Sequence, residues 1–291
     1  MDIIGFIGLG IMGESMCENI INAGYETWVY DIEPEKVEKL ASLGGKPSQD
    51  ITELATHANR VIIMVPNNEH VEDVISKLLP VMQKDTIIID MSTISPDISK
   101  KLAVDVENQE CHMIDAPVVK SKAAAIAGDL GILVGGDRDI FDKVKPILDC
   151  MGKNIIHMGP NGSGLAMKLC HNMLVGEIQN GVNEMLVLAQ AAGLHFDDVI
   201  KAISYGGGQN FYLDVKSTSL KARDFSPKFP FEHMNKDMQL VIRFAGNLGL
   251  FLPCAHHVKD IYKKGMEKGL QREDFSATLK LVQQEGSKGS R

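Results

Sequence analysis

The hydrophobic positions change their period about halfway along the chain. Up to about residue 160, short apolar and β-branched runs alternate with helical patterns; the runs are IIGFIGL, TWVYD, NRVIIMV, TIIIDM, CHMIDAP, GILVGG and NIIHMG. Strands of a parallel sheet become continuously apolar when helices cover both faces of the sheet. We therefore predict a doubly wound α/β domain with a parallel sheet over residues 1–160.

Strand-like runs nearly vanish after Gly162. The stretch 164–194, rich in Ala, Leu and Met, is typical of one long helix, and further helical periods occur near 197–204, 234–248, 253–268 and 274–284. We predict an all-α domain over residues 161–291, with the long helix connecting it to the first domain. The last six residues, GSKGSR, are typical of a disordered tail.

Composition narrows the function classes. The 291 residues, of which 44% are apolar, favour a globular protein, and a net charge of −8 argues against a nucleic-acid partner. The chain lacks a long apolar run and a leader-like N-terminus, so we expect a cytoplasmic protein without a membrane partner. The five cysteines form no C-x-x-C pair, and His171 and His233 form no ligand set, so we expect buried thiols and no metal site.

The segment GFIGLGIMG carries a glycine pattern that is typical of dinucleotide binding. Gly8, Gly10 and Gly13 follow the strand-like IIGFI and precede a helical pattern. In this arrangement the first glycine permits a tight turn, the second lets a pyrophosphate approach the backbone, and the third allows close helix packing. Ile11 and Met12 belong to the same cofactor loop. An acid at the end of the second strand would support a dinucleotide site in a Rossmann-like domain; a glycine turn that binds no ligand is the alternative.

That acid is Asp31, at the end of TWVYD and 18 residues after Gly13. Its carboxylate can accept hydrogen bonds from the adenosine ribose hydroxyls, and it would repel the 2′-phosphate of NADP. No arginine follows in DIEPEK, so we predict NAD as the cofactor.

Two further strand ends, MVPNN at 64–68 and MSTISP at 91–96, should face the cofactor at the carboxyl edge of the sheet. We expect Val65 and Pro66 to line the nicotinamide half and the Thr93 hydroxyl to bond to it. Helix capping by Ser92 or Thr93 is the alternative.

The long helix opens with GPNGSGLAMKLCHNML, which places Lys168 and Asn172 four residues apart on one face. A lysine in an apolar stripe can lie at a solvated edge with its stem on the core. It can also hold its ammonium beside a substrate oxygen and give up a proton, while Asn172 fixes the same oxygen.

The order of the motifs resembles that of the β-hydroxyacid dehydrogenase family, which includes 3-hydroxyisobutyrate dehydrogenase. The motifs are GFIGLGIMG, DMST, DAPV-(12)-GDL, G-x-x-x-K-x-x-x-N and KDMQL. The resemblance implies dimers or tetramers, and a reaction that interconverts a β-hydroxy acid and its semialdehyde. It further implies that Lys168 is catalytic, that Asn172 orients the substrate, and that Thr93 and Lys236 lie by the cofactor.

One segment departs from the family pattern. Most of the family has Ser-Gly-Gly after DAPV to hold a substrate carboxylate, whereas this chain has Val119, Lys120 and Ser121. We expect Lys120 and Ser121 to bind a more strongly anionic group such as a sulfonate, and the segment is similar to that of sulfolactaldehyde reductases. Our first candidate reaction reduces sulfolactaldehyde to 2,3-dihydroxypropane-1-sulfonate. A solvated Lys120 and a succinic, methylmalonic or tartronate semialdehyde are the alternatives.

Two points stay open at this stage. The run Gly206–Gly208 falls between predicted helices, either as a plain turn or over the substrate mouth. A chain of this architecture can also serve as a non-catalytic, NAD-binding scaffold, although Lys168 is present here.

Overall fold

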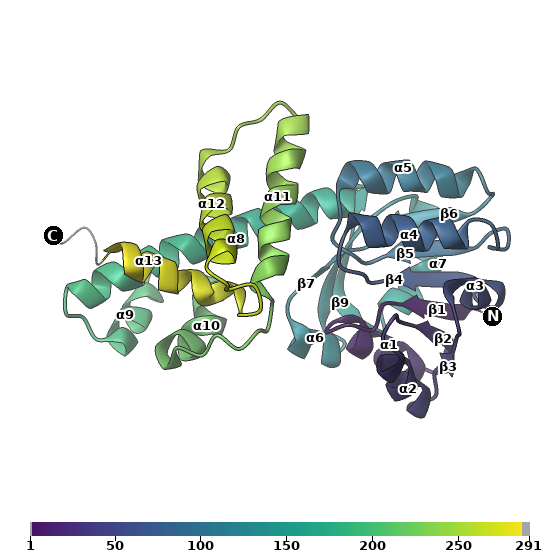
Figure 1. The fold of residues 1–291 in the computed structure, drawn as a ribbon, viewed down its shortest axis with the longest axis horizontal. Coiled ribbons are helices and arrows are strands. Elements are labelled where there is room, and N and C mark those ends of the chain that lie inside the picture. The colour runs from purple at the N-terminus through teal and green to yellow at the C-terminus, as the bar shows by residue number, and fades with distance from the viewer. Residues whose placement is uncertain (1, 287–291) are drawn as a thin grey trace. The chain divides into compact units, whose positions relative to one another are not determined.

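The computed structural model describes residues 2–286, and the chain divides into two compact units, Met1–Lys168 and Leu169–Arg291. The first is an α/β unit and the second is helical (Figure 1). Most of the predicted tail, residues 287–291, lies outside the described residues.

The α/β unit is built on one nine-stranded sheet within the described residues. Its strands are β1 (Ile3–Ile7), β2 (Glu26–Tyr30), β3 (Lys46–Pro47), β4 (Arg60–Ile63), β5 (Ile87–Asp90), β6 (His112–Asp115), β7 (Val118–Val119), β8 (Leu130–Gly135) and β9 (Gly152–Gly159). The order is β3-β2-β1-β4-β5-β6-β8-β7, with β9 beside β8. This Rossmann-like arrangement confirms the predicted fold class.

The sheet is parallel from β3 to β6 and changes direction at β8, which runs antiparallel to β6 and β7. The sequence patterns did not indicate this change. After β6 the chain continues through β7 and a short helix and then reverses direction to form β8. The strand β8 therefore runs antiparallel to β7, and Val118 pairs with Ile132. The strand β9 is again parallel to its neighbour β8.

Helices cover both faces of the sheet and explain the apolar strands. They are α1 (Gly13–Asn22), α2 (Pro34–Ser42), α3 (Ile51–His57), α4 (Asn68–Leu78), α5 (Pro96–Glu107), α6 (Lys122–Ile126) and α7 (Arg138–Leu148). In β5, Ile87 and Ile89 pack in a core with α1, α2, α6 and α7, whereas Ile88 packs in a second core with α3, α4 and α5. Both side-chain directions of a strand are therefore buried, which leaves the strand ends and their loops for function.

The helical unit is formed by the later part of one long helix and by the helices that follow it. The elements are α8 (Ser163–Ala191), α9 (Phe196–Ile203), α10 (Phe211–Ala222), α11 (Phe231–Asn247), α12 (Pro253–Glu267), the short η1 (Phe275–Ala277) and α13 (Thr278–Gly286). All the predicted helical periods correspond to helices, but α10 was missed. Its apolar and polar residues do not separate into two faces, and it begins at an Asn210 cap whose side chain accepts the N–H of Leu213 at 2.8 Å.

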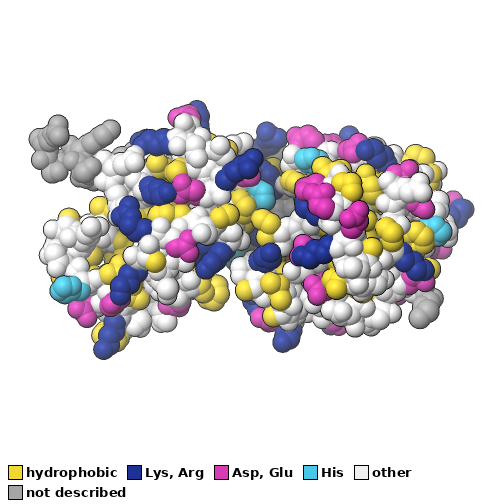
Figure 2. Space-filling model, turned by 60° about the horizontal axis from the view of Figure 1, so that its bottom comes forward, with side chains coloured by type: hydrophobic (Ala, Val, Ile, Leu, Met, Phe, Trp, Pro, Cys, Tyr) yellow, Lys and Arg dark blue, Asp and Glu magenta, His cyan; other side chains and the backbone are white. Residues whose placement is uncertain are grey.

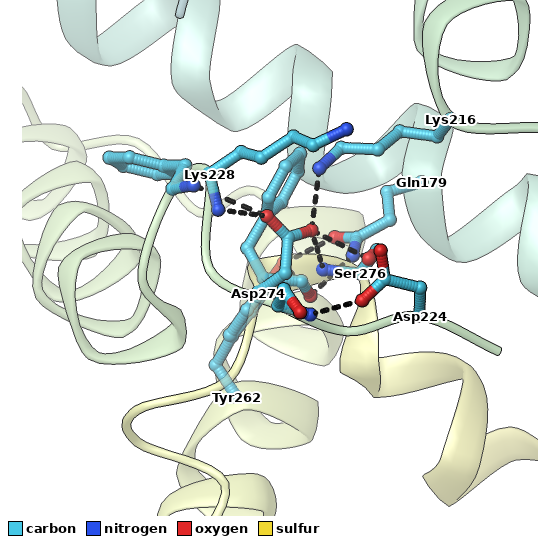
Figure 3. Close-up of polar contacts among 10 residues, drawn as sticks. Gln179, Lys216, Asp224, Lys228, Tyr262, Asp274 and Ser276 are labelled. Carbon is cyan, nitrogen blue, oxygen red and sulfur yellow. Dashed lines mark hydrogen bonds and ion pairs between the residues drawn. The ribbon is translucent and has the colours of Figure 1, made fainter. Parts of the chain in front are cut away.

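A buried ion pair lies inside the helical unit (Figure 3). Lys216 of α10 donates to Asp274 at 2.6 Å, and both side chains are at most 8% exposed. Asp274 also accepts the hydroxyl of Ser276 at 2.6 Å and the backbone N–H of Lys228 at 3.0 Å. Tyr262 of α12 donates to Gln179 of α8 beside this pair. The cluster therefore joins α8, α10 and α12 to the loop before η1.

The surface carries charges of both signs. On the face drawn in Figure 2, the Lys and Arg side chains are interspersed with Asp and Glu side chains and do not form a continuous basic surface. Among residues 2–286, none of the helices is long and apolar enough to cross a membrane.

Candidate active site

Three glycines shape the loop between β1 and α1, each for a separate reason. Gly8 has a φ of +96°, and a Cβ there would lie 2.2 Å from the carbonyl oxygen of Met64. A Cβ on Gly13 would lie 2.0 Å from the carbonyl oxygen of Gly8. A Cβ on Gly10 would meet no atom within 4 Å. The turn itself requires Gly8 and Gly13, whereas Gly10 keeps open the space that a pyrophosphate needs to approach the backbone.

The start of α1 and the end of β2 fit the same ligand. The N-cap side chain of α1, that of Met12, makes no hydrogen bond to the N-terminal amides, which favour a phosphate. Asp31 accepts the N–H of Leu9 at 2.6 Å and that of Glu33 at 2.9 Å. The structure therefore places Asp31 beside the glycine loop, and Ile11 lies in this loop with 45% of its surface exposed.

The ends of β4 and β5 are tied together by Ser92. Its hydroxyl, which is buried, accepts the N–H of Val65 at 3.0 Å. The N-cap of α5 is Ser95, so neither Ser92 nor Thr93 stands at that position. Pro66 and Thr93 lie in the same two loops, next to this hydrogen bond. Sequence reasoning missed this role of Ser92, whose signal was a serine two residues after the end of a buried strand.

Lys168 lies on α8 and is only 9% exposed. The solvated-edge alternative is therefore wrong. Asp115, at the end of β6, accepts the N–H of Gly162 at 2.6 Å and that of Leu165 at 2.8 Å, so it holds the beginning of this helix. Burial raises the pKa of Asp115, although the amides of Gly162 and Leu165 act in the opposite direction. Sequence reasoning missed the role of Asp115. The signal was an acidic residue at the end of an apolar strand, within the segment CHMIDAP.

Asn172 lies one turn after Lys168 on α8 and is 5% exposed. Its Nδ2 donates to Oδ2 of Asp237 at 2.6 Å, and its Oδ1 lies 3.1 Å from Nδ1 of His171. Lys236, on α11, has its Nζ 3.3 Å from Oδ1 of Asp237. Asp237 therefore fixes the amide of Asn172. Sequence reasoning missed it, although an acid within the buried stripe of α11 was a usable signal.

Lys120 adopts a left-handed backbone, with a φ of +84°, a conformation that favours glycine. Its Nζ donates to Oδ2 and to the carbonyl oxygen of Asp129, both at 2.7 Å. The hydrogen bond from Lys120 lowers the pKa of Asp129. Ser121 is the N-cap of α6, but its hydroxyl does not cap the helix. Lys120 is exposed, as the solvated alternative expected, and its ammonium pairs with Asp129, a surface carboxylate that sequence reasoning missed.

A glycine turn with an acid beside it, at the carboxyl edge of a doubly wound sheet, defines a dinucleotide-dependent protein. Lys168, which is buried near the beginning of α8, adds a group able to transfer a proton. Fold and site together define a nicotinamide-dependent oxidoreductase.

Comparison with known proteins agrees with this class. Residues 3–159 match the family model described as the NAD binding domain of 6-phosphogluconate dehydrogenase. Residues 162–282 match the model described as NAD-binding of NADP-dependent 3-hydroxyisobutyrate dehydrogenase. The chain belongs to the β-hydroxyacid dehydrogenase family.

Individual relatives cover nearly the whole chain. The mitochondrial 3-hydroxyisobutyrate dehydrogenase of Drosophila melanogaster is 34% identical, over 97% of this chain and 90% of its own. The 3-sulfolactaldehyde reductase of Escherichia coli K12 is 31% identical, over 97% and 96%. The structure of Mycobacterium tuberculosis 3-hydroxyisobutyrate dehydrogenase with L-serine is 31% identical, with a TM-score of 0.91 over 97% and 99%.

These relatives are enzymes. The chain is therefore an NAD-binding oxidoreductase that acts on hydroxyl or aldehyde groups, and the scaffold alternative has no support.

Proposed function

We propose that this enzyme prefers NAD and interconverts a small anionic semialdehyde and its hydroxy acid, with the reduction of sulfolactaldehyde to 2,3-dihydroxypropane-1-sulfonate as the first candidate. The observation that carries the proposal is the burial of Lys168, 9% exposed, one turn before Asn172 on α8. Burying an ammonium is costly, so its place in an apolar helix favours a chemical role.

Lys168 acts as the general acid in the reduction. When bound, NADH supplies the hydride that adds to the aldehyde carbon. The Lys168 ammonium stabilises the negative charge that develops on the aldehyde oxygen and then donates a proton to it. In the reverse direction the neutral amine takes this proton back. Asn172 has two amide N–H groups, of which one bonds to Asp237, and the other orients the same substrate oxygen.

The cofactor is held by residues of the α/β unit. Gly10 gives the pyrophosphate its place at the start of α1, while Asp31 accepts the ribose hydroxyls and disfavours a 2′-phosphate. Loop residues complete the proposed cofactor site: Gly8, Ile11, Met12, Gly13, Val65, Pro66 and Thr93, together with Lys236.

Lys120 and Ser121 hold the acid group of the substrate. The side chains of Lys120 and Asp129 are 32% and 39% exposed. An ion pair with this exposure contributes roughly 0–1 kcal/mol to the free energy of unfolding. A sulfonate can therefore displace the carboxylate of Asp129 and gain the ammonium at little cost. The likeness to the Escherichia coli 3-sulfolactaldehyde reductase supports this substrate.

A carboxylate semialdehyde is the second candidate. Asp129 already neutralises the ammonium of Lys120, which lowers the advantage of a strongly anionic head group. The Drosophila relative and the Mycobacterium tuberculosis structure with L-serine are named for carboxylate chemistry.

Rates of NADH oxidation with sulfolactaldehyde and with succinic semialdehyde separate the two candidates. We expect the sulfonate to be preferred, Lys120→Ala to raise its KM about tenfold, and Asp129→Asn to lower it a few-fold. Lys145→Ala is the matched control, because Lys145 forms a surface pair with Asp149 at the same 2.7 Å. Preference for the carboxylate, unchanged in Lys120→Ala, would overturn the sulfonate and support the second candidate.

We further propose a cytoplasmic homodimer or homotetramer with an NAD-binding domain over 1–160 and a helical domain over 161–291. Large apolar side chains at the surface of the helical unit support the assembly: Leu188, Phe211 and Phe251 are at least 71% exposed. Light scattering after size-exclusion chromatography gives the mass directly, and a monomer at micromolar concentration would contradict the assembly.

A further inference from the structure

The Asp115 carboxylate is fully buried, and the proposed reaction does not use it. Its Oδ1 accepts the N–H of Gly162 at 2.6 Å and its Oδ2 accepts the N–H of Leu165 at 2.8 Å. These amides lie just before α8 and in its first turn, where backbone N–H groups have no partner within the helix. One side chain of the sheet therefore binds the helix at two points.

Two glycines allow this close approach. A Cβ on Gly135, at the end of β8, would lie 2.5 Å from the Asp115 carboxylate. A Cβ on Gly164, in the first turn of α8, would lie 2.9 Å from the carboxylate and 2.2 Å from the carbonyl oxygen of Leu133. Neither glycine has a positive φ, so the requirement is for space and not for conformation. The glycine four residues before Lys168 is explained by the contact with Asp115.

The two amides that bind Asp115 lie shortly before Lys168 along the chain. Leu165 is three residues before Lys168 and Gly162 is six, so the anchored amides lie about 4.5 and 9 Å from Lys168 along the helix axis. Because the Lys168 side chain is 9% exposed, its surroundings limit how far it can swing to correct a shifted backbone. The position of the ammonium then depends on where the helix begins.

We propose that Asp115 is a positioning residue that acts through Lys168, by fixing the first turn of α8. This inference rests on the proposed role of Lys168 as the acid. A misplacement of about 1 Å can cost on the order of a hundredfold in rate, so a small shift of the first turn is enough to matter.

Asp115→Asn tests the proposal, because the amide has the same shape but turns an N–H group toward one of the two backbone N–H groups. We expect kcat to fall about 30- to 100-fold, with KM within about threefold, since the helix start moves while the substrate contacts remain. NADH titration by fluorescence counts the folded, cofactor-binding enzyme and corrects the rate for it.

The decisive measurement repeats Asp115→Asn in the Lys168→Ala background, by single turnover at high enzyme concentration. If Asp115 acts through Lys168, the second change should lower the residual rate by less than about threefold. Asp274→Asn is the control, because Asp274 is also a buried carboxylate that accepts backbone N–H groups, and any effect of it should be the same in both backgrounds.

The other possible results distinguish failure of the Asp115 proposal from failure of the proposed role of Lys168. An equal loss from Asp115→Asn in both backgrounds would overturn the proposal and leave the role of Lys168 intact. A loss below tenfold for Lys168→Ala alone would instead overturn the proposed acid. If Asp115→Asn does not fold, Gly135→Ala, which crowds the carboxylate without removing it, takes its place in the test. Failure of both variants to fold would assign Asp115 to stability and overturn the proposal.

Discussion

Each unit buries two carboxylates among the residues that the structure describes, and Asp115 in one unit and Asp274 in the other are held differently. Asp115 in the α/β unit accepts backbone N–H groups from the start of α8, whereas Asp274 in the helical unit pairs with the Lys216 ammonium and the Ser276 hydroxyl. Backbone donors fix the place of a helix, while side-chain donors fix how neighbouring elements pack. The same residue type therefore fixes the start of a helix in one unit and joins packed elements in the other.

The pKa values of the two groups shift in opposite directions. Burial raises the pKa of Asp115, and the two amides only partly offset it. Burial also acts to raise the pKa of Asp274, but the charge and hydrogen bond of Lys216 outweigh it and hold this pKa below its usual value.

The largest effect should come from replacing Lys168, which lies on the helix whose start binds Asp115. Lys168→Ala should lower kcat by about a thousandfold, because it removes both the acid and the charge that stabilises the alkoxide. The affinity for NADH, measured by fluorescence titration, should stay within about threefold, since the cofactor loop is untouched. A loss smaller than tenfold would show that another group supplies the proton.

The next effect should fall on the helical unit. Lys216→Ala leaves Asp274 buried without its cation and should lower the free energy of unfolding by roughly 3–5 kcal/mol. Urea unfolding followed by circular dichroism measures the loss. The control is Lys221→Ala, whose pair with Asp197 has side chains 55% and 72% exposed and should contribute less than about 1 kcal/mol. Equal losses would contradict the distinction between the buried and the exposed pair.

A third carboxylate extends the comparison to the cofactor. Asp31 accepts the backbone N–H groups of Leu9 and Glu33, yet it is only partly buried, so it can still accept a ligand. Asp31→Ala should shift the ratio of kcat/KM for NAD over NADP toward NADP by about 10- to 100-fold. An unchanged ratio would show that Asp31 does not contact the ribose.

The smallest effect concerns pH. The lowered pKa of Asp274 means that its contribution to stability is present above the ordinary Asp pKa and is lost as pH falls below it. The raised pKa of Asp115 has the opposite sign, so its contribution decreases as pH rises above the ordinary Asp value.

Unfolding followed by circular dichroism from about pH 2 to pH 6.5 tests both signs, when each wild-type value is compared with Asp115→Asn or Asp274→Asn. The single tryptophan, Trp28 on β2, reports the α/β unit by fluorescence. Differences that move with pH in the same direction for both variants would contradict the assignment.

The sequence predicted the parts of the molecule that depend on neighbours along the chain. The first strand, glycine turn and helix, and then the strand that ends at Asp31, follow from local periodicity and from the conformation that Gly8 must adopt. The helix α10 was missed because its burial depends on other helices and not on an apolar face. The antiparallel β8 was missed because strand direction depends on pairing.

Most of what was missed in the site is a contact between distant residues. Asp115 is 47 and 50 residues from its two amides, and Asp237 is 65 residues from Asn172. Lys120 was named, but Asp129, on the far side of α6, was not paired with it. Periodicity identifies which residues are buried, but it does not tell which of them meet.

The open space at Gly10 means that a substitution there should have a different effect from one at Gly8 or Gly13. Substitutions at Gly8 or Gly13 collide with backbone and would reach the cell as misfolded chains, which quality control removes. An alanine at Gly10 meets no atom within 4 Å, so that chain should fold and persist while its methyl group occupies the space proposed for the pyrophosphate. Abundance measurements would score this allele as healthy, and only an assay of cofactor binding would detect the loss.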